Sequence, residues 1–359
     1  MNGQAPASRY ADEVAPVRPG EDLDWTRIET HLRANVPGMT GAFSVLQFPN
    51  GSANLTYRIR FGEMLLVLRR PPFGRIALGA HDMRREFRTL SRLWRGYPRA
   101  PRGLLFCEDT SVAGAEFLII EYRPGIVVWD GMPESFLPYS DAGHRVGLAV
   151  VDALADLHRT DPAALGLDGL GRPEGFLSRQ VTRWTQRWEL ASGASTSPEV
   201  SHLAALLAET LPESGPPALL HNDFKIDNCQ FAPGEPDVVT SVFDWDMATL
   251  GDPLVDLGTL LNYWPDPEFG DAGALASHNL SRLGLPSRTE LIEHYLARSG
   301  HDVEQVDWYE AFGCFRTAVI LQQLHQRYVA GETQDTRMAA YGHHVEGLAA
   351  RGLTRLAQL

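Results

Sequence analysis

One stretch of the chain, residues 219–246, limits the folds that it can adopt, because it alternates short apolar runs with clustered polar side chains. It reads LLHNDFKIDNCQFAPGEPDVVTSVFDWD. Apolar runs at 218–220 and 229–231, and a longer one from 238 to 243, predict short buried strands. A Pro/Gly turn at 232–236 separates the later two. The polar side chains therefore lie at strand ends and in loops, where binding and catalytic residues are common.

The polar residues of this stretch have a spacing typical of phosphoryl transfer. His221, Asp223, Lys225 and Asn228 form the pattern H-x-D-x-K-x-x-N, and Asp244 follows the last apolar run. This order is that of the kinase catalytic loop and the metal-binding aspartate after it. Phosphoryl transfer requires a carboxylate that orients the acceptor hydroxyl, and oxygen ligands that hold Mg2+ on the phosphates of ATP.

These requirements predict a role for each residue. We expect Asp223 to be the catalytic base and Lys225 to contact the transferring phosphate. We expect Asn228 and Asp244 to bind Mg2+, with ATP as the co-substrate. The alternative is that all four are solvated residues of ordinary loops. A strand-borne Asp244 at the correct distance, between apolar flanks, favours the catalytic interpretation.

The segments HNDFKIDN and VFDWDMATLGDPLVDLGTLLNYW resemble the aminoglycoside phosphotransferase and choline kinase superfamily. The resemblance is closest to the branch that forms the kinase-like N-terminal region of certain acyl-CoA dehydrogenase family members. It implies an α+β, two-lobed protein-kinase-like fold. The expected parts are a flexible tail at 1–20, a nucleotide-binding N-lobe at 21–122 with an antiparallel sheet plus a helix, and a larger, mainly helical, catalytic and substrate-binding C-lobe at 123–359.

Two positions depart from the family pattern. Family members usually carry Gly where this chain has Asn222, and often Glu where it has Asp246. Neither change removes a catalytic group, but Asn222 is expected to alter the backbone just before the base.

The N-lobe sequence alternates helix and strand patterns. We expect a helix at 25–35 with Asp24 as its cap, strands at 44–48, 55–61 and 63–69, a helix at 81–94, and strands at 104–107 and 116–122.

The turn between the first two strands takes the place of the kinase glycine-rich loop, whose backbone donors lie over phosphates. Gly51, Ser52 and Asn54 are therefore candidate nucleotide contacts. With one glycine, the turn is also compatible with an ordinary hairpin.

The third strand ends in a cation. Period-two alternation places Val67 and Arg69 on one face, where they match the small residue and the lysine of the kinase V-A-I-K strand. Arg69 is then expected to reach the ATP phosphates and to pair with Glu86 of the following helix. Arginine replaces the usual lysine, which keeps the charge but changes its geometry. Arg70 competes with Arg69 for this role. The alternative is that Arg69 is a surface cation at the strand end and Glu86 a helix-face charge that pairs with a neighbouring arginine.

The segment Arg123-Pro124-Gly125 breaks the sheet and is the expected hinge between the lobes. The family resemblance implies that main-chain groups of Glu121 and Arg123 receive the adenine ring.

The C-lobe sequence is largely helical. Expected helices lie at 146–157, 179–190, 288–298, 308–328 and 334–356. His158 is expected to support the catalytic loop. Gly251-Asp252-Pro253 and Asp256 resemble the family's G-D-P-x-x-D segment, with Asp252 as the helix cap and Pro253 in the first turn.

The helix at 179–190 carries two side-by-side stripes. Trp184 and Trp188 lie four residues apart, and Arg183 and Arg187 form a parallel cationic stripe. The tryptophans favour core packing. The arginines are also compatible with an anionic substrate such as a coenzyme A thioester. Tyr263, Trp264 and Gln322 are further candidate substrate contacts.

The composition narrows the classes of partner. A formal net charge of −13 argues against nucleic-acid binding, which requires a basic surface. Three separated cysteines form no C-x-x-C pair, so neither a disulfide framework nor a zinc knuckle is indicated. No signal peptide and no apolar run of about 18 residues is visible. We expect a cytoplasmic protein with no membrane partner, and its oligomeric state stays open.

Missing motifs narrow the chemistry. P-loop, zincin, esterase and Rossmann signatures are absent, and D-W-D replaces the D-F-G of protein kinases. We therefore expect a kinase for the hydroxyl group of a small molecule, such as a hydroxyacyl-CoA or a related metabolite. The alternatives are an aminoglycoside or macrolide phosphotransferase, and a catalytically idle nucleotide-binding module.

Overall fold

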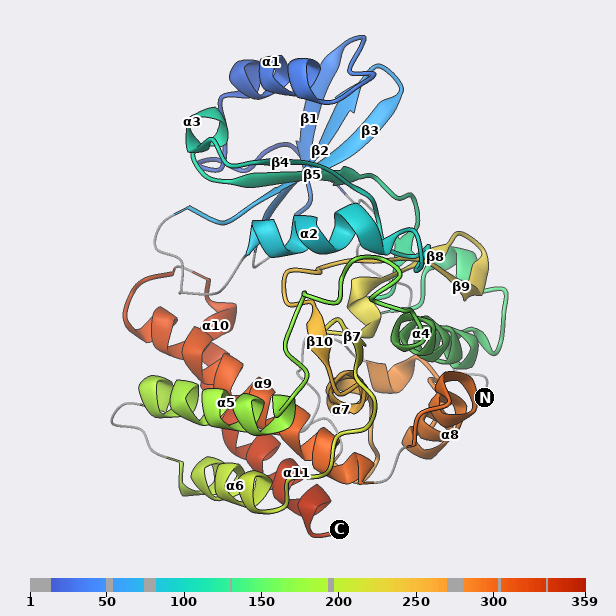
Figure 1. Cartoon of the computed structure of the whole chain (residues 1–359), viewed down its shortest axis with the longest axis vertical. Helices are drawn as coiled ribbons and strands as arrows, with labels where there is room; N and C mark the ends of the chain where they lie inside the picture. The colour runs from blue at the N-terminus through green and yellow to red at the C-terminus, as the bar shows by residue number, and fades with distance from the viewer. Residues whose placement is uncertain are drawn as a thin grey trace.

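A twisted five-stranded antiparallel sheet forms the upper lobe of the molecule, and a wider, mainly helical lobe lies below it (Figure 1). The strands are β1 (Phe43–Gln47), β2 (Leu55–Phe61), β3 (Met64–Arg70), β4 (Gly103–Cys107) and β5 (Phe117–Glu121), in the order β1-β2-β3-β5-β4. The computed structural model describes residues 14–49, 54–73, 82–129, 131–192, 197–269, 280–302, 305–333 and 335–359.

The two faces of this sheet pack against different helices. Leu66 and Leu68 of β3 share a core with Ile28 and Leu32 of α1 (Trp25–Asn35). The short α3 (Thr110–Ala113) joins that core. Val67 points to the opposite face and packs in one core with α2 (Met83–Leu93) and the lower lobe. The predicted alternation along β3 is therefore confirmed, and α2 lies between the sheet and the lower lobe (Figure 1).

Helix α1 begins where the sequence predicts. The Asp24 side chain accepts a hydrogen bond of 3.0 Å from the backbone N–H of Arg27, which satisfies one of the free donors of the first turn. Helix α2 begins at Met83, two residues after the expected start, and Asp82 caps it in the same way.

The segment before α1 covers the outer edge of the sheet. Ala15 and Gln47 exchange two backbone hydrogen bonds of 2.8 Å each. Arg18 extends this contact, because its Nη1 donates to the carbonyl oxygen of Pro49 at 2.9 Å. Residues 14–20, which the sequence placed in a flexible tail, thus lie along β1. Residues 1–13 are outside the described part of the chain.

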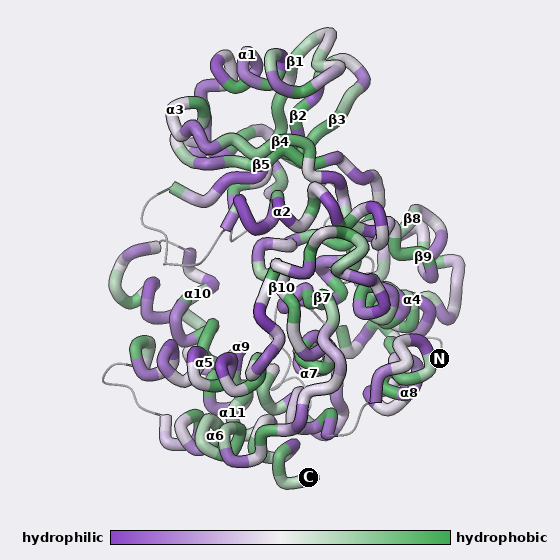
Figure 2. The backbone as a smooth tube through the Cα atoms, viewed as in Figure 1, coloured by the Kyte–Doolittle hydropathy of each residue, from purple (hydrophilic) through white to green (hydrophobic). Residues whose placement is uncertain are grey.

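Helices make up most of the lower lobe (Figures 1 and 2). They are α4 (Ala142–His158), α5 (Phe176–Ser192), α6 (Pro198–Glu209), α7 (Leu254–Tyr263), α8 (Arg288–Ser299), α9 (Val306–Val329), α10 (Arg337–Ala340) and α11 (Val345–Leu356). Short 3-10 turns lie at Glu134–Phe136, Ile226–Asn228, Leu280–Arg282 and Tyr341–His344. No helix of the described residues is both long and apolar enough to span a bilayer.

Two small sheets hold the loops of interest between these helices. β7 (Ala218–Leu220) pairs with β10 (Thr249–Gly251), and β8 (Cys229–Ala232) pairs with both β6 (Ile126–Val127) and β9 (Glu235–Val242). The loops that follow β7 and β9 therefore leave neighbouring small sheets.

The last predicted helix is not continuous. It consists of α10, a 3-10 turn and α11, and Gln334 lies outside the described residues. Gly342 lies in the 3-10 turn. A Cβ atom added to it would lie 3.0 Å from the His325 ring. Glycine weakens a helix interior, and this close contact explains why a larger residue is not used there.

Helices α7 and α9 approach each other unusually closely at two glycines. A Cβ on Gly258 would lie 2.2 Å from the carbonyl oxygen of Tyr309, and one on Gly313 would lie 2.7 Å from that of Gly258. Both obstacles are backbone atoms, which cannot rotate away. The pair sets the spacing of the two helices that support the loop after β7.

We predict that Gly258→Ala lowers the free energy of unfolding by about 1–3 kcal/mol, because the added methyl group overpacks the α7–α9 contact. Urea denaturation would measure the loss. Gly215→Ala is the matched control, since nothing lies within 4 Å of its Cβ. Equal midpoints for the two variants would contradict the close contact.

Candidate functional site

Two loops meet at the centre of the molecule, one following β7 and the other following β9. His221 links them: its Nδ1 accepts from the backbone N–H of Asp223 at 3.2 Å, and its Nε2 lies 2.7 Å from the carbonyl oxygen of Phe243. This pattern assigns the proton to Nε2, which donates to Phe243. A second link runs from Phe243 N–H to the Asn228 carbonyl oxygen at 2.9 Å.

Asp223, Lys225 and Asn228 converge within the first loop. The Asn228 amide nitrogen donates to the carbonyl oxygen of Asp223 at 2.8 Å and to its carboxylate at 3.2 Å. The Lys225 ammonium lies 3.0 Å from the same carboxylate. Burial alone would lower the pKa of Lys225, but Asp223 and Asp227 raise it well above its usual range. Lys225 is thus a permanent cation beside the Asp223 carboxylate at neutral pH.

Arg69 brings the sheet into contact with the second loop. Its guanidinium lies 2.6 Å from a carboxylate oxygen of Asp244 and 3.3 Å from one of Glu86, which is fully buried on α2. Burial opposes the charged form of Arg69, but Glu86 and Asp244 raise its pKa above the usual range. The competing Arg70 faces the other side of the sheet, where its Nη1 donates to the carbonyl oxygen of Ala113 at 2.8 Å.

Acidic groups outnumber cations where the two loops meet. Burial, followed by the charge of Asp244, raises the pKa of Asp246 to about 8. Burial also raises the pKa of Glu86 to about 7, although Arg69 opposes this. The pKa of Asp244 is lowered: burial would raise it, but Arg69 and Lys225 outweigh that effect. The crowding of acids therefore keeps Asp246 largely protonated at neutral pH, whereas Asp244 stays ionised beside Arg69.

Two residues of the loops adopt left-handed backbone conformations. Asn222 has a φ of 67° and Asp244 a φ of 68°. Glycine and asparagine are the residues that adopt this conformation most readily, so Asn222 can replace the glycine usual in the resembled family without changing the backbone. Its amide also donates to the Met247 carbonyl oxygen at 2.9 Å, a contact that glycine cannot make.

Asp256 of α7 fixes the loop from below. Its carboxylate accepts the backbone N–H groups of His221 and Asn222, each at 2.7 Å, and lies 3.3 Å from Nε2 of His158. His158 is held in turn by the Tyr295 hydroxyl at 2.7 Å from its Nδ1. His158 thus lies beneath the loop, as the sequence suggested for a supporting residue.

The helix start at α7 differs from expectation in one detail. Asp252 accepts from the Leu254 N–H at 3.0 Å, but Pro253 is the cap residue rather than the first residue of the helix.

The structure describes most of the expected nucleotide contacts. Asn54 is buried, and neither its side-chain oxygen nor its nitrogen has a partner among the residues that the structure describes. Gly51 and Ser52 lie outside the described residues. At the hinge, the Glu121 N–H donates to the Arg102 carbonyl oxygen at 2.9 Å, so this N–H already has a partner. The Arg123 and Glu121 side chains pair at 3.1 Å.

Sequence reasoning assigned no role to two residues of this site. Arg316 of α9 donates from its Nη2 to the carbonyl oxygen of Asn222 at 2.8 Å. No local pattern pointed to it, because it lies far from the loop along the chain. Asp246 was noticed within the motif but received no function, although the motif D-W-D places it beside Asp244.

The residues present fit a magnesium ion. Asn228 directs its amide nitrogen to Asp223, which leaves its oxygen for a metal, and Asp244 supplies a carboxylate. No three His, Cys, Asp or Glu side chains form a ready metal cage in the described ranges. Magnesium in phosphoryl-transfer sites is held by one or two carboxylates together with substrate phosphates and water, so a full protein cage is not needed.

Comparison with known proteins agrees with this geometry. Residues 44–291 match the model of a family described as the phosphotransferase enzyme family. The chain is 32% identical to mouse (Mus musculus) acyl-CoA dehydrogenase family member 10 and to rat (Rattus norvegicus) acyl-CoA dehydrogenase family member 11. The matches cover 93% and 95% of the chain, but only 31% and 44% of those relatives. The chain therefore spans less than half of the length of these relatives.

Solved structures show the same fold. A protein from Ralstonia eutropha, assigned to the aminoglycoside phosphotransferases, superposes with a TM-score of 0.77 at 28% identity, over 94% of this chain and 99% of that one. An aminoglycoside phosphotransferase in ternary complex with AMP-PNP and hygromycin B superposes with a TM-score of 0.56 at 18% identity, over 90% and 98%. The expected two-lobed kinase-like fold is confirmed.

We predict that Asp246→Asn stabilises the protein increasingly as pH rises. An unfolded aspartate titrates near ~3.9, whereas Asp246 titrates at about 8 in the fold. Between these values the folded protein holds a proton that the unfolded chain has lost, so the wild type loses stability with rising pH. The gain of the variant should grow from pH 5 to pH 8, reach on the order of 1–3 kcal/mol, and then level off.

Thermal or urea unfolding without Mg2+ would test this pH dependence. The exposed Asp237, which pairs with Arg145 at 2.6 Å, provides the control Asp237→Asn, for which the difference from wild type should stay flat. If the stability difference between Asp246→Asn and wild type also stays constant with pH, the crowding of acids at the site is contradicted.

Proposed function

Because the chain belongs to the phosphotransferase enzyme family, we propose that it transfers the γ-phosphoryl group of ATP to a hydroxyl group of a small molecule. One observation carries the proposal: Asp223, Lys225 and Asn228 converge in one loop, while Asp244 of the neighbouring loop binds Arg69. This arrangement supplies a base, phosphate-binding cations and metal ligands at a single place, which are the groups that phosphoryl transfer uses.

Asp223 is the proposed catalytic base. It accepts the proton of the acceptor hydroxyl and orients the oxygen toward the phosphorus atom. Its carboxylate is held by Asn228 and Lys225, and its backbone N–H by His221. These contacts fix its position before the acceptor arrives, so little reorganisation is needed during the reaction.

Lys225 and Arg69 are the proposed phosphate-binding cations. The raised pKa of Lys225 keeps its ammonium charged, so it stabilises the charge on the transferring group rather than acting as a base. Arg69 approaches from the sheet and is positioned by Glu86. Val67, two residues earlier on the same face of β3, supplies an apolar surface for the adenine. Asn54 is proposed to contact the phosphates.

Asn228 and Asp244 would hold Mg2+, which neutralises the phosphates and polarises the bond that breaks. The 2.6 Å contact of Asp244 with Arg69 keeps that carboxylate at the junction of the two lobes. At the hinge, the Glu121 carbonyl and the Arg123 N–H are the proposed partners of the adenine ring. The acceptor class to test first is a hydroxylated acyl thioester, since relatives of this chain are named for acyl-CoA dehydrogenases.

We predict that Asp223→Asn lowers kcat by about 10²–10⁴-fold, the usual cost of losing a general base, and leaves ATP binding nearly unchanged. Phosphorus NMR with ATP and pooled hydroxylated metabolites would identify the product, and calorimetry would measure ATP binding. Asp237→Asn makes the same charge change on the surface and should retain full turnover. Full turnover in Asp223→Asn would remove Asp223 from the proposed role.

We predict that Asp244→Asn weakens nucleotide binding only in the presence of Mg2+. The substitution removes a carboxylate ligand, so the affinity for Mg-ATP should fall by about tenfold or more, an effect typical of losing one charged contact. Calorimetry with ATP, with Mg2+ and with EDTA, would separate the two conditions. An equal loss in EDTA would show that Asp244 acts on the protein rather than through the metal.

A further inference from the structure

Two arginines from different helices stack on one tryptophan beside the candidate site. The Arg187 guanidinium of α5 lies 4.6 Å from the centre of the Trp184 ring, and the Arg316 guanidinium of α9 lies 5.3 Å from it. Trp184 and Arg316 are each only 4% exposed. Helices α5 and α9 run next to each other across the lower lobe (Figure 1), so this contact belongs to their interface.

Contacts lead directly from this tryptophan to the proposed base. Arg316 donates to the carbonyl oxygen of Asn222, the residue that precedes Asp223. The charge of Asp223 also influences the pKa of Arg316, which confirms that the two groups are near each other. All of these residues belong to the lower lobe, whereas Arg69 reaches the site from the sheet. Arg316 therefore contacts the loop that carries Asp223 from the lower lobe, and Arg187 lies on the same tryptophan ring as Arg316.

The charges of Asp256 and Asp223 favour the charged form of Arg316, whereas the two arginines of α5 lack an acidic partner among the described residues. Within the described ranges, no carboxylate forms an ion pair with Arg187 or with its neighbour Arg183. Burial, then the charge of Arg183, lowers the pKa of Arg187. Arg316 also has a fully buried Nε without any hydrogen-bond partner. Half-buried cations without a counter-charge are unusual in a chain whose 45 acidic residues outnumber 32 basic ones.

Packing alone explains only part of this arrangement. Arg316 has a structural partner in the Asn222 carbonyl oxygen, and Trp184 fills the helix interface. Among the described residues, Arg187 stacks on the ring of Trp184 and forms no ion pair, although it is half-buried. An anion bound there would restore the missing charge and gain a charge-assisted hydrogen bond.

We propose that Arg187, with Arg183, binds an oxyanion of the acceptor, a carboxylate or a phosphate group. The inference rests on the proposed kinase function and specifies its substrate class: the acceptor is an anionic alcohol. The planar guanidinium of Arg187 matches the two oxygens of such a group, and the Trp184 ring holds it in place. Polycationic aminoglycosides are disfavoured acceptors, because the cluster repels them.

A panel of acceptors tests the substrate class. Short hydroxy acids and hydroxyl-bearing phosphomonoesters form the two anionic arms, and their amides or methyl esters and an aminoglycoside serve as neutral and cationic comparisons. We expect only the anionic compounds to be phosphorylated, as detected by phosphorus NMR. Whether the hydroxy acids or the phosphomonoesters react faster shows whether the site recognises a carboxylate or a phosphate group. Equal or faster reaction of the neutral or cationic compounds would overturn the proposal.

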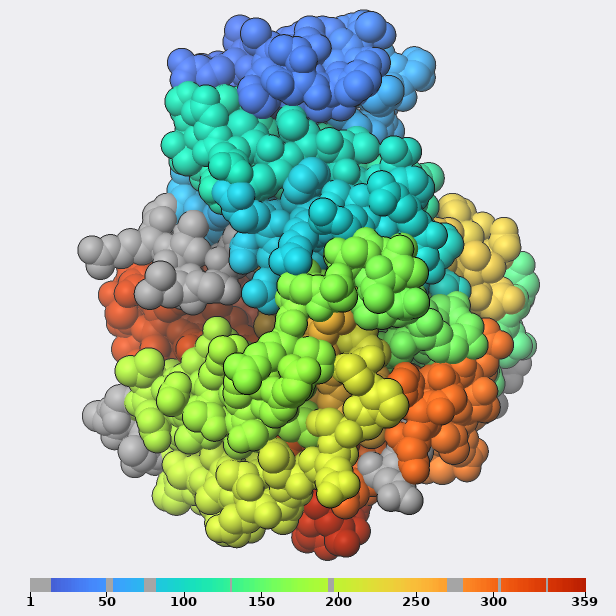
Figure 3. Space-filling model, viewed as in Figure 1, coloured from blue at the N-terminus to red at the C-terminus, as the bar shows by residue number. Residues whose placement is uncertain are grey.

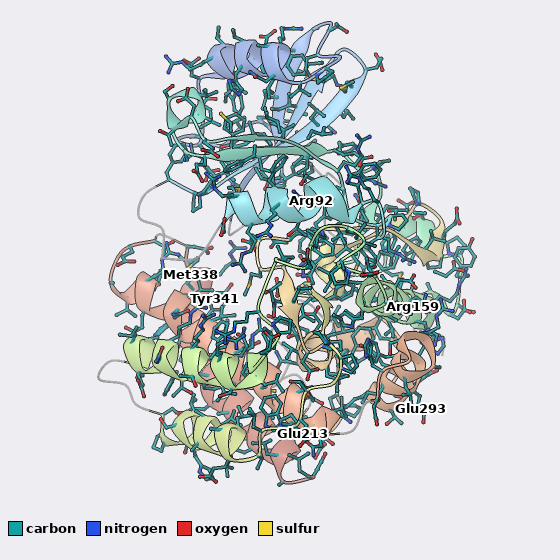
Figure 4. All side chains as sticks on the ribbon, in the orientation of Figure 1. Arg92, Arg159, Glu213, Glu293, Met338 and Tyr341 are labelled. Carbon is teal, nitrogen blue, oxygen red and sulfur yellow. The ribbon has the colours of Figure 1, made fainter. Side chains whose placement is uncertain are left out.

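The same panel tests Arg187 itself. Arg187→Gln should raise KM for the anionic acceptor by about tenfold or more without changing KM for ATP, and Arg187→Lys should recover part of the loss. The control Arg298→Gln removes one positive charge from α8. This helix, on which Figure 4 labels Glu293, lies across the lower lobe from α5. An unchanged acceptor KM in Arg187→Gln, or an equal rise in Arg298→Gln, would refute the assigned residue.

A binding experiment separates this proposal from the kinase function. Inorganic phosphate is titrated by calorimetry into protein saturated with Mg2+ and AMP-PNP, so that no transfer step is involved. Wild type and Arg298→Gln should bind phosphate alike, and Arg187→Gln about tenfold more weakly. No phosphate binding to the wild type, or equal binding to all three proteins, would overturn the anion site even if phosphorylation is observed.

Discussion

The loop that carries Asp223 depends on one buried carboxylate. Asp256 is 0% exposed and accepts the backbone N–H groups of His221 and Asn222, while His158 approaches its second side. Burial alone would raise the pKa of this carboxyl, but the contacts with His158 and His221 lower it, so it remains an anion. A charge this deep is stable only because every nearby donor points at it. The position of Asp223 follows from this anchor.

Asp256 connects the loop to the packed helices of the lower lobe. Asp256 belongs to α7, which contacts α9 at Gly258 and Gly313. Arg316 of α9 donates a hydrogen bond to the same loop. The loop is therefore held from two helices that are themselves in backbone contact. Arg69 adds a third support from the sheet through Asp244. Figure 3 shows the narrower upper lobe seated on the broad lower one, the arrangement that these contacts span.

Local patterns in the sequence predicted the fold better than they predicted the site. Helix α1 and strand β2 have the expected bounds, because caps, turns and alternation are local properties. Helix α6 was missed although Ser197 caps it and Pro198 opens it, signals that the sequence contains. The motif indicated that Asp223, Asn228 and Asp244 would meet. It could not reveal Arg316 or the pairing of β7 with β10, since both are contacts between distant segments that only packing determines.

The strip of backbone from Ala15 to Arg18 also matters for the solution behaviour of the protein. By pairing with Gln47 it occupies hydrogen-bonding groups that an outermost strand otherwise presents to its surroundings. An uncovered strand of this kind is a template for pairing between molecules and so for aggregation. Residues that take no part in the proposed chemistry thus cover part of the sheet edge, and removing them would expose the backbone groups of Gln47 for pairing between molecules.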